Sequence, residues 1–263
     1  MDLATFRGDW ALVTGASSGI GREFALKLAE TGLNVVVVAR REQRLEELAA
    51  LLRRSNAIRT KVIALDLASA GAAEALKDRL TADGCRIRLL CNNAAFGHWG
   101  RFEKASQASY QSMVQVNVGT LVATCFAFFA DLKSFPSSVV INVSSAAALQ
   151  PVPYLAVYAA TKAFVQSFGQ ALHGEWKEHG ILVQTLVPGP TETEFDRVAG
   201  AYASALTKRG SAADVVSDAL AALGRDDPVA FSAKGTLTQR MFAGLAPPRL
   251  VIREVAKRFR PPE

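Results

Sequence analysis

The chain reads WALVTGASSGIG from Trp10 to Gly21, a short apolar run followed by a glycine-rich turn. The run has the character of a buried strand, and a helical pattern begins near Arg22. In this context the glycines allow a tight turn and a close backbone approach, while the helix N-terminus directs free N–H groups and a partial positive charge at an anion. The segment therefore predicts a strand–turn–helix unit that binds a pyrophosphate, although a glycine-rich turn alone also marks ordinary loops.

The rest of the chain alternates between short β-branched runs and longer segments with helical periodicity. The four valines at 35–38 indicate a strand buried on both faces, as in a parallel sheet covered by helices. Further strands are predicted at 61–65, 87–91, 139–143, 181–187 and 228–231, and helices at 41–55, 72–82, 105–132, 156–178 and 211–223. This order is typical of the α/β class with a Rossmann-type, doubly wound parallel sheet and helices on both faces. Because no repeat or low-complexity linker divides the chain, residues 1–263 are interpreted as a single domain.

Composition excludes several classes of protein. With 50% hydrophobic and 21% charged residues, the chain is neither disordered nor a fibrous repeat. The longest nearly apolar stretch, Leu121–Ala130, falls short of the roughly 20 residues of a membrane-spanning helix. Asp2, Arg7 and Asp9 interrupt any signal-like core, so we expect a cytoplasmic protein without a membrane span. The three cysteines lack C-x-x-C spacing and the histidines lack ligand partners, so neither a disulfide framework nor a metal site is expected.

The formal charge of +6 favours anionic ligands. Basic residues gather around the second predicted strand and in the C-terminal tail, but without the interleaved aromatic residues of a single-strand-binding face, so no nucleic-acid partner is expected. The second strand ends in Ala39-Arg40-Arg41, where dinucleotide-binding folds usually carry a carboxylate for the ribose hydroxyls. Forked guanidinium donors favour a 2′-phosphate there, and therefore NADP(H) over NAD(H), unless both arginines are simply solvated at a helix start. Asp66, after the third strand, either accepts a hydrogen bond from adenine or caps the next turn.

Tyr158 and Lys162 lie four residues apart on the predicted helix 156–178 and therefore share one face. An ammonium group one turn from a phenol stabilises the phenolate, which predicts a lowered tyrosine pKa and a usable acid–base group. A pair with this spacing is also common on helix surfaces, where it has no chemical role.

Motifs in a fixed order run from about Trp10 to Thr193: Thr14–Gly21, Asp66, Asn92-Asn93-Ala94, Asn117, Ser145, Tyr158-x-x-x-Lys162 and Pro188-Gly189. In this set the sequence resembles the short-chain dehydrogenase/reductase family, in its compact single-domain branch. The resemblance implies a sheet of about seven strands, a nicotinamide cofactor across its carboxyl ends, and an Asn-Ser-Tyr-Lys catalytic group. It also implies a cofactor-binding and catalytic core at 10–190, followed by a substrate lid and C-terminal helices at 191–263.

The resemblance assigns a role to each catalytic side chain. Tyr158 is expected to protonate the carbonyl oxygen during reduction, or to act as the base in the reverse direction. Ser145, preferred to Ser144 by its spacing to the tyrosine, would hydrogen-bond that oxygen. Lys162 would bind the nicotinamide ribose and tune Tyr158, and Asn117 would hold a water in a proton relay.

The same resemblance predicts the surroundings of cofactor and substrate. The cofactor-binding residues would be Gly15, Ser17, Ser18, Gly19, Ile20, Gly21, Arg40, Arg41, Asp66, Leu67, Asn93, Ala94, Tyr158, Lys162, Pro188, Gly189, Thr191 and Thr193. The substrate wall would include Phe96, His98, Trp99, Val152, Tyr154 and Phe195 under a lid at 193–207, with a purely structural role as the alternative for His98. This wall holds no Arg or Lys, which favours a hydrophobic substrate over a small acid held by a charged clamp. Ala95 departs from the family's usual glycine, and we expect its methyl group to be tolerated.

These observations predict an NADP(H)-dependent oxidoreductase that transfers hydride between nicotinamide and the carbonyl or alcohol carbon of a small hydrophobic substrate, such as a 3-oxoacyl, steroid-like or polyketide-like ketone. A non-catalytic NADP(H)-binding regulator on the same fold is the alternative, whereas a sugar epimerase or dehydratase would need a longer substrate domain. By analogy with the family, the two long helices predict a homodimer or homotetramer. In the tail, Val251, Val255 and Phe259 recur every four residues beside basic ones. This amphipathic helix either packs on the body or a partner subunit, or binds an anionic membrane surface.

Overall fold

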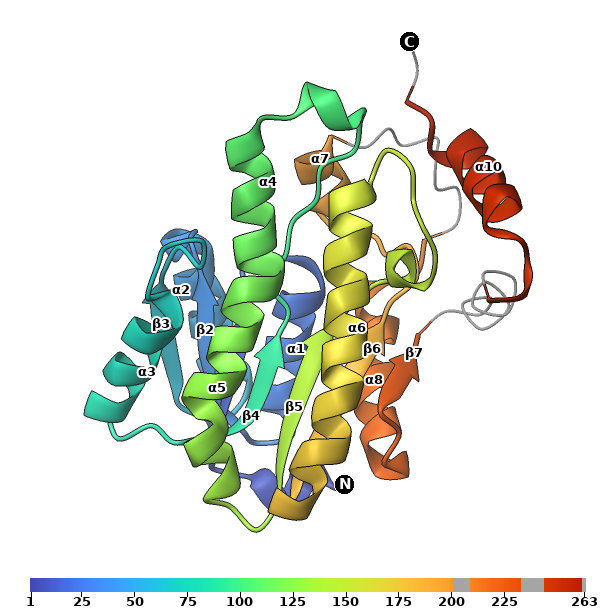
Figure 1. The fold of residues 1–263 in the computed structure, drawn as a ribbon. Coiled ribbons are helices and arrows are strands. Elements are labelled where there is room, and N and C mark those ends of the chain that lie inside the picture. Colours follow the sequence, from blue (N-terminus) through green and yellow to red (C-terminus); the bar gives the residue numbers. More distant parts are fainter. Residues whose placement is uncertain (201–208, 233–243, 262–263) are drawn as a thin grey trace.

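The computed structural model of the chain describes residues 1–200, 209–232 and 244–261. At its centre is a seven-stranded parallel sheet in the order β3-β2-β1-β4-β5-β6-β7 (Figure 1). The strands are β1 (Trp10–Thr14), β2 (Asn34–Ala39), β3 (Thr60–Ala64), β4 (Ile87–Asn92), β5 (Ser138–Val143), β6 (Ile181–Val187) and β7 (Val229–Phe231). The fold class is confirmed, and each predicted strand boundary lies within one residue of the observed one.

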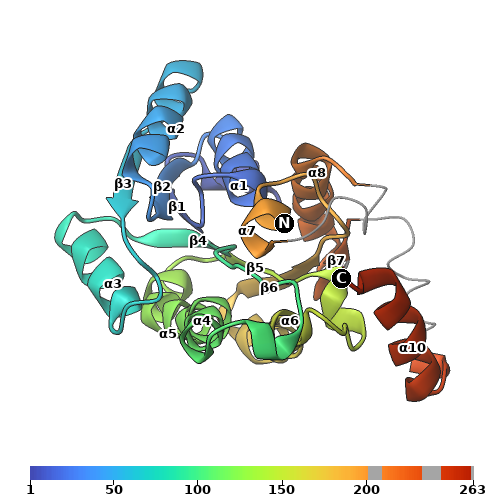
Figure 2. The same cartoon turned by 90° about the horizontal axis from the view of Figure 1, so that it is seen from above.

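Helices cover both faces of the sheet (Figure 2). One face carries α1 (Gly19–Glu30), α2 (Glu42–Ser55) and α8 (Ala212–Ala222), and the other carries α3 (Ala72–Ala82), α4 (Gln107–Val114), α5 (Thr120–Lys133) and α6 (Ala156–Trp176). Side chains of β2 alternate between the two layers: Val35 and Val37 join the apolar cluster with α1, and Val36 and Val38 join the cluster with α5. Because both faces are covered, every residue of β2 is buried, as its valine run predicts.

The chain changes direction across the sheet between β1 and β4. From β1 it proceeds outward through β2 to β3, then returns to place β4 on the other side of β1. In doubly wound sheets, ligands bind in the crevice that this reversal opens beyond the carboxyl ends of the strands. Gly15 follows β1 and Asn93 follows β4, so both lie at this point.

The helix predicted at 105–132 is interrupted. A π-helical turn, Gln115–Gly119, joins α4 to α5 and contains Asn117. The whole run Gln107–Lys133 has 27 residues and a mean hydropathy of 1.7 in its most apolar part, so by length and composition alone it is long enough to cross a membrane. The expectation that the apolar stretch is too short for this criterion is therefore wrong, because Val114, Val116 and Val118 extend it in the N-terminal direction and outweigh the polar residues between them, and no charged residue interrupts it. In the structure the run packs against β4, α3 and α6 as part of the domain.

The predicted C-terminal helix is α10 (Pro248–Phe259). Val251 and Val255 are buried in an apolar cluster that also contains Trp99 and Leu155. The Phe259 ring stacks on Trp99 with centroids 5.1 Å apart, and the Trp99 indole N–H donates to the Phe259 carbonyl at 2.9 Å. These contacts favour packing on the body over the membrane alternative.

Candidate active site

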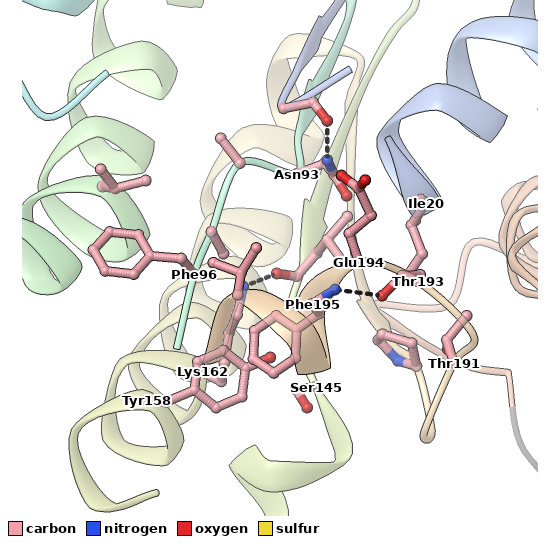
Figure 3. Close-up of a pocket in the computed structure, with 18 of the residues that line it drawn as sticks. Ile20, Asn93, Phe96, Ser145, Tyr158, Lys162, Thr191, Thr193, Glu194 and Phe195 are labelled. Atoms are coloured by element: carbon pink, nitrogen blue, oxygen red, sulfur yellow. Dashed lines mark hydrogen bonds between the residues drawn. The ribbon is translucent and has the colours of Figure 1, made fainter. Parts of the chain in front are cut away.

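A cavity of about 460 Å³ extends along the carboxyl ends of the strands, from the glycine-rich turn to Tyr158 (Figure 3). All predicted cofactor-binding residues line it except Gly21. Four residues of the predicted substrate wall also line it: Phe96, Trp99, Val152 and Phe195. The residues that the sequence separates by up to 180 positions therefore meet in one cavity.

The glycine-rich turn has the backbone that its sequence predicts. Gly15 and Gly19 have φ angles of +67° and +55°, which L side chains rarely adopt. A Cβ atom at Gly19 would lie 2.9 Å from Cγ2 of Thr193, so only glycine fits. Ser18 stands at the N-cap of α1 but its side chain makes no capping hydrogen bond, which leaves the first N–H groups of the helix available to an anion.

Asn93 joins the ends of β4 and β1. Its Nδ2 donates to the carbonyl oxygens of Thr14 at 2.9 Å and Gly15 at 3.3 Å, and its backbone N–H donates to Thr14 Oγ1 at 3.0 Å. Gly21 packs beneath it, where a Cβ would collide with the Asn93 side chain and the Gly15 carbonyl. Gly21 thus serves helix–strand packing and does not line the cavity. Ala95 has no positive φ, so its methyl group causes no backbone strain.

The end of β2 brings two arginines to the turn. Arg41 donates to Ser17 Oγ from Nη2 at 2.8 Å and Nε at 3.1 Å, and to Ser18 Oγ at 2.8 Å. Arg40 also lines the cavity. Both arginines therefore lie at the end of the cavity where the sequence predicts a 2′-phosphate.

Glu194 reaches the same end of the cavity from the segment after β6, and it is a site residue that was not predicted from the sequence. Its carboxylate pairs with Arg41 at 2.6 Å and with Arg44 at 2.9 Å. The Arg44 guanidinium, followed by that of Arg41, lowers the pKa of Glu194 to about 2. Since its partners are 153 and 150 positions away, no local signal could have indicated this pair.

Asp66 accepts a hydrogen bond from the Ala68 N–H at 3.0 Å, so the turn-capping alternative is confirmed. The residue also lines the cavity, and its contact with adenine stays a prediction.

Tyr158 and Lys162 are buried together on α6. The pKa of Tyr158 is raised to about 12, mainly by burial; a hydrogen bond with the Ser145 hydroxyl opposes the rise and the charge of Asp196 adds to it. Burial lowers the pKa of Lys162 to about 7. The Lys162 Nζ donates to the Val143 carbonyl at 2.7 Å and lies 5.9 Å from the tyrosine ring centroid. The expectation of a lowered tyrosine pKa is therefore wrong in this state, because desolvation outweighs an ammonium that is itself poorly solvated.

Both Ser144 and Ser145 line the cavity, but they differ in their contacts, and the preference for Ser145 as the catalytic serine stays a prediction. Ser144 donates from its hydroxyl to the Lys162 carbonyl at 2.8 Å and is buried, so it anchors β5 to α6. Ser145 lies on the cavity wall beside Tyr158 (Figure 3).

Asn117 does not line the cavity. Its Oδ1 accepts from the Phe96 N–H at 3.1 Å, and its Nδ2 donates to the Phe96 carbonyl and to Thr161 Oγ1, each at 3.0 Å. The side chain thereby fixes the segment after β4 against α6, and its water-holding role stays a prediction.

The substrate side of the cavity is mostly apolar. The Phe195 ring, at the start of α7 (Phe195–Ala199), lies against Tyr158 with centroids 4.9 Å apart (Figure 3). Arg258 and Phe259 of α10 also line the cavity. The expectation that this wall holds no Arg or Lys is therefore wrong, because Arg258 reaches the cavity on α10, 100 residues beyond Tyr158. Residues 201–207 of the predicted lid lie outside the described part of the chain.

Two residues of the predicted substrate wall do not line the cavity. His98 packs edge-on against Tyr110, with ring centroids 6.0 Å apart, in agreement with the structural alternative. Tyr154 has a φ of 68° and packs in the apolar cluster around Trp99, while its carbonyl accepts from the Gly100 N–H at 2.9 Å. Neither side chain therefore forms part of the cavity wall.

The donors present fit a nicotinamide dinucleotide. An uncapped helix N-terminus and a glycine turn without room for side chains suit a pyrophosphate, and the arginines beside Ser17 suit a further phosphate. Tyr158 and Lys162 line the same cavity, and Asn93 lines it beside the glycine-rich turn.

Comparisons with known proteins agree with this geometry. The family model described as short chain dehydrogenase matches residues 9–202. A solved short-chain dehydrogenase from Sphingobium yanoikuyae in complex with NADPH is 31% identical, with a TM-score of 0.80 over 85% of this chain and 87% of that one.

Two curated relatives are longer than this chain. The very-long-chain 3-oxoacyl-CoA reductase of Anas platyrhynchos is 32% identical over 73% of this chain and 62% of its own length. The 17-beta-hydroxysteroid dehydrogenase type 3 of Mus musculus is 30% identical over 72% of this chain and 62% of its own length. The chain thus spans less than two thirds of either relative. From the family model and the solved structure together, the chain belongs to the short chain dehydrogenase family.

Proposed function

We propose that this protein is an NADP(H)-dependent oxidoreductase that transfers hydride between nicotinamide and the carbonyl or alcohol carbon of a hydrophobic substrate. The observation that carries the proposal is the single cavity that holds Tyr158 and Ser145 at one end and Arg41 at the other. The bound cofactor supplies the hydride, and the protein supplies binding, orientation and the proton. The NADPH-bound relative and the two reductase and dehydrogenase relatives support the same class.

In the proposed reduction, Tyr158 gives its phenolic proton to the carbonyl oxygen while Ser145 hydrogen-bonds that oxygen. Lys162 holds the nicotinamide ribose and supports the tyrosinate that the proton transfer leaves. Because burial raises the pKa of Tyr158 to about 12, the phenol carries its proton at neutral pH, which is the form that reduction requires.

The substrate part of the proposal rests on the wall around Tyr158. Phe195, Trp99 and Phe259 offer aromatic surface to a long or bulky apolar group. Arg258, whose guanidinium carbon lies 5.9 Å from the Phe259 ring centroid, adds a cation beside this aromatic surface. Within the proposed ketones, this cation favours a 3-oxoacyl thioester whose carrier bears phosphates over an uncharged steroid-like or polyketide-like ketone.

The proposal is tested first by cofactor binding. NADPH and NADH are titrated into the purified protein and followed by nicotinamide fluorescence. NADPH is expected to bind more tightly, and Arg41→Ala to weaken NADPH far more than NADH, because only NADPH carries the 2′-phosphate. Equal weakening of both would reject the phosphate contact.

Turnover is tested with NADPH and a panel of 3-oxoacyl thioesters and cyclic ketones. Tyr158→Phe is expected to reduce kcat by at least about 100-fold with little change in NADPH affinity, because it removes only the phenolic proton. Tyr110→Phe, the same change outside the cavity, is the matched control. Tight NADPH binding by the wild type with no turnover of any substrate would favour the non-catalytic regulator.

We also propose a homo-oligomer built on α5 and α6. Phe126 on α5 is 84% exposed and Phe164 on α6 is 42% exposed, which are unusual positions for phenylalanine on a free surface. A second copy of the same helices would cover both rings.

A further inference from the structure

Glu194 is an acidic side chain at the anion-binding end of the cavity. Its Oε2 accepts from Arg41 Nη1 at 2.6 Å, and both of its carboxylate oxygens accept from Arg44 Nη1 at 2.9 Å. Arg197 adds a third contact at 3.2 Å. The carboxylate therefore occupies guanidinium groups that an anionic ligand would otherwise engage.

The guanidinium groups of Arg41 and Arg44 would bind a phosphate more strongly than they bind the Glu194 carboxylate. Arg41 and Arg44 carry two positive charges against the single negative charge of Glu194. A phosphate monoester carries about −1.5 to −2 at neutral pH and presents three acceptor oxygens. A ribose hydroxyl, which NAD(H) has in place of the phosphate, is neutral and cannot compete with a carboxylate for these donors.

Glu194 is also connected to the chemical end of the cavity through the segment 193–199. The Thr193 side chain packs on Gly19 of the phosphate-binding turn. The Glu194 carbonyl accepts from the Val198 N–H at 3.0 Å in the first turn of α7. The next residue, Phe195, lies against Tyr158, and the Ala199 carbonyl accepts from the Trp99 N–H at 2.8 Å. One short segment thus contacts both the arginine pair and the catalytic tyrosine.

We propose that Glu194 is a specificity-determining residue for the cofactor: the 2′-phosphate of NADP(H) displaces its carboxylate from Arg41 and Arg44, and this displacement frees the segment 193–199 from Tyr158. The inference rests on the proposed NADP(H) site. NAD(H) leaves the carboxylate in place, so Phe195 stays on the tyrosine ring. The 2′-phosphate then has two effects: it strengthens the binding of the cofactor, and it opens access to Tyr158.

Binding is tested with two nucleotides that differ in the position of one phosphate. Adenosine 2′,5′-bisphosphate carries the 2′-phosphate, and adenosine 5′-diphosphate lacks it. Glu194→Gln is expected to bind the 2′,5′-bisphosphate about tenfold more tightly than the wild type, since two partly exposed ion pairs no longer have to be broken. Its affinity for the 5′-diphosphate is expected to stay within twofold. Glu192→Gln, just before this segment and without a contact to Arg41 or Arg44, is the matched control and is expected to change neither affinity.

Displacement of the segment is tested by hydrogen exchange. In the wild type, the 2′,5′-bisphosphate is expected to accelerate exchange at the amides of Phe195, Val198 and Gly200, and the 5′-diphosphate is not. In Glu194→Gln these amides are expected to exchange rapidly without ligand. Equal affinity of Glu194→Gln and wild type for the 2′,5′-bisphosphate, or unaltered exchange when it is bound, would overturn the inference. If the wild type binds the two nucleotides equally, the NADP(H) assignment itself fails.

Discussion

Lys162→Met is expected to abolish turnover and yet stabilise the cofactor-free protein at pH 7. Burial lowers the pKa of Lys162 from 10.5 to about 7. At about 1.4 kcal/mol per pKa unit, this shift lowers the free energy of unfolding at pH 7 by roughly 5 kcal/mol, because the unfolded chain keeps the lysine protonated. Methionine removes this loss but leaves the buried Val143 carbonyl without its donor, which costs about 1 to 3 kcal/mol. A net gain of about 2 to 4 kcal/mol remains.

The sign of the pH dependence follows from the same shift. Between pH 7 and about 10 the unfolded chain binds the lysine proton and the folded chain does not, so wild-type stability rises with pH over this range. The advantage of Lys162→Met is therefore expected to shrink and to vanish between about pH 8.5 and 10. Reversible urea unfolding measures this stability advantage. At pH 7 the midpoint of the variant is expected to be higher by about 1 M, if the free energy of unfolding falls by about 3 kcal/mol per molar urea. Lys133→Met, at an exposed position of α5, is the control, with a midpoint close to wild type. A variant less stable than wild type at pH 7, or a difference that does not change with pH, would refute the reasoning.

Three further predictions test other parts of the structure. Gly97→Ala would place a Cβ atom 2.7 Å from the Phe195 ring. We therefore expect kcat/KM for a bulky ketone to fall about tenfold, while the Kd of NADPH stays within twofold. A loss of NADPH affinity instead would contradict the placement of Gly97. Phe126→Asp puts a charge on the exposed apolar face and is expected to yield a monomer in light scattering with an unchanged circular dichroism spectrum, whereas an intact oligomer would place the interface elsewhere. Burial raises the pKa of Cys91 and brings that of Cys125 to about 12, so neither thiol is expected to react with a disulfide reagent until urea unfolds the chain; rapid labelling of either in the folded protein would contradict its burial.

The sheet and most helices could be predicted because their signals are local. A run such as Val35–Val38 marks a doubly covered strand wherever it occurs, and the sequence of alternating elements then limits the topology. The π-helical turn at Asn117 escaped prediction because its residues keep an ordinary helical pattern. It is set by tertiary contacts, in which the Asn117 side chain bonds to Phe96 and Thr161.

The candidate site was predictable where a motif carries its own geometry. The glycine turn and the Tyr158–Lys162 pair are of this kind. Glu194 and Arg258 reach the cavity from distant segments, so nothing near them in the sequence marks them. The direction of the Tyr158 pKa shift also depends on burial, which the four-residue spacing does not report.

The central position of β1 in the sheet has a consequence for synthesis on the ribosome. One edge of β1 pairs with β2, which follows closely in the sequence. The other edge of β1 pairs with β4, whose first residue is Ile87, and stays unpaired until β4 is made. At about 5 to 20 residues per second, that edge remains without its neighbour for roughly 4 to 15 seconds after Trp10 is made. During this interval the nascent chain exposes a row of unpaired backbone groups on an apolar strand, which is a template for pairing with another chain. The same strand that builds the phosphate-binding turn is therefore the one most in need of a chaperone while the chain grows.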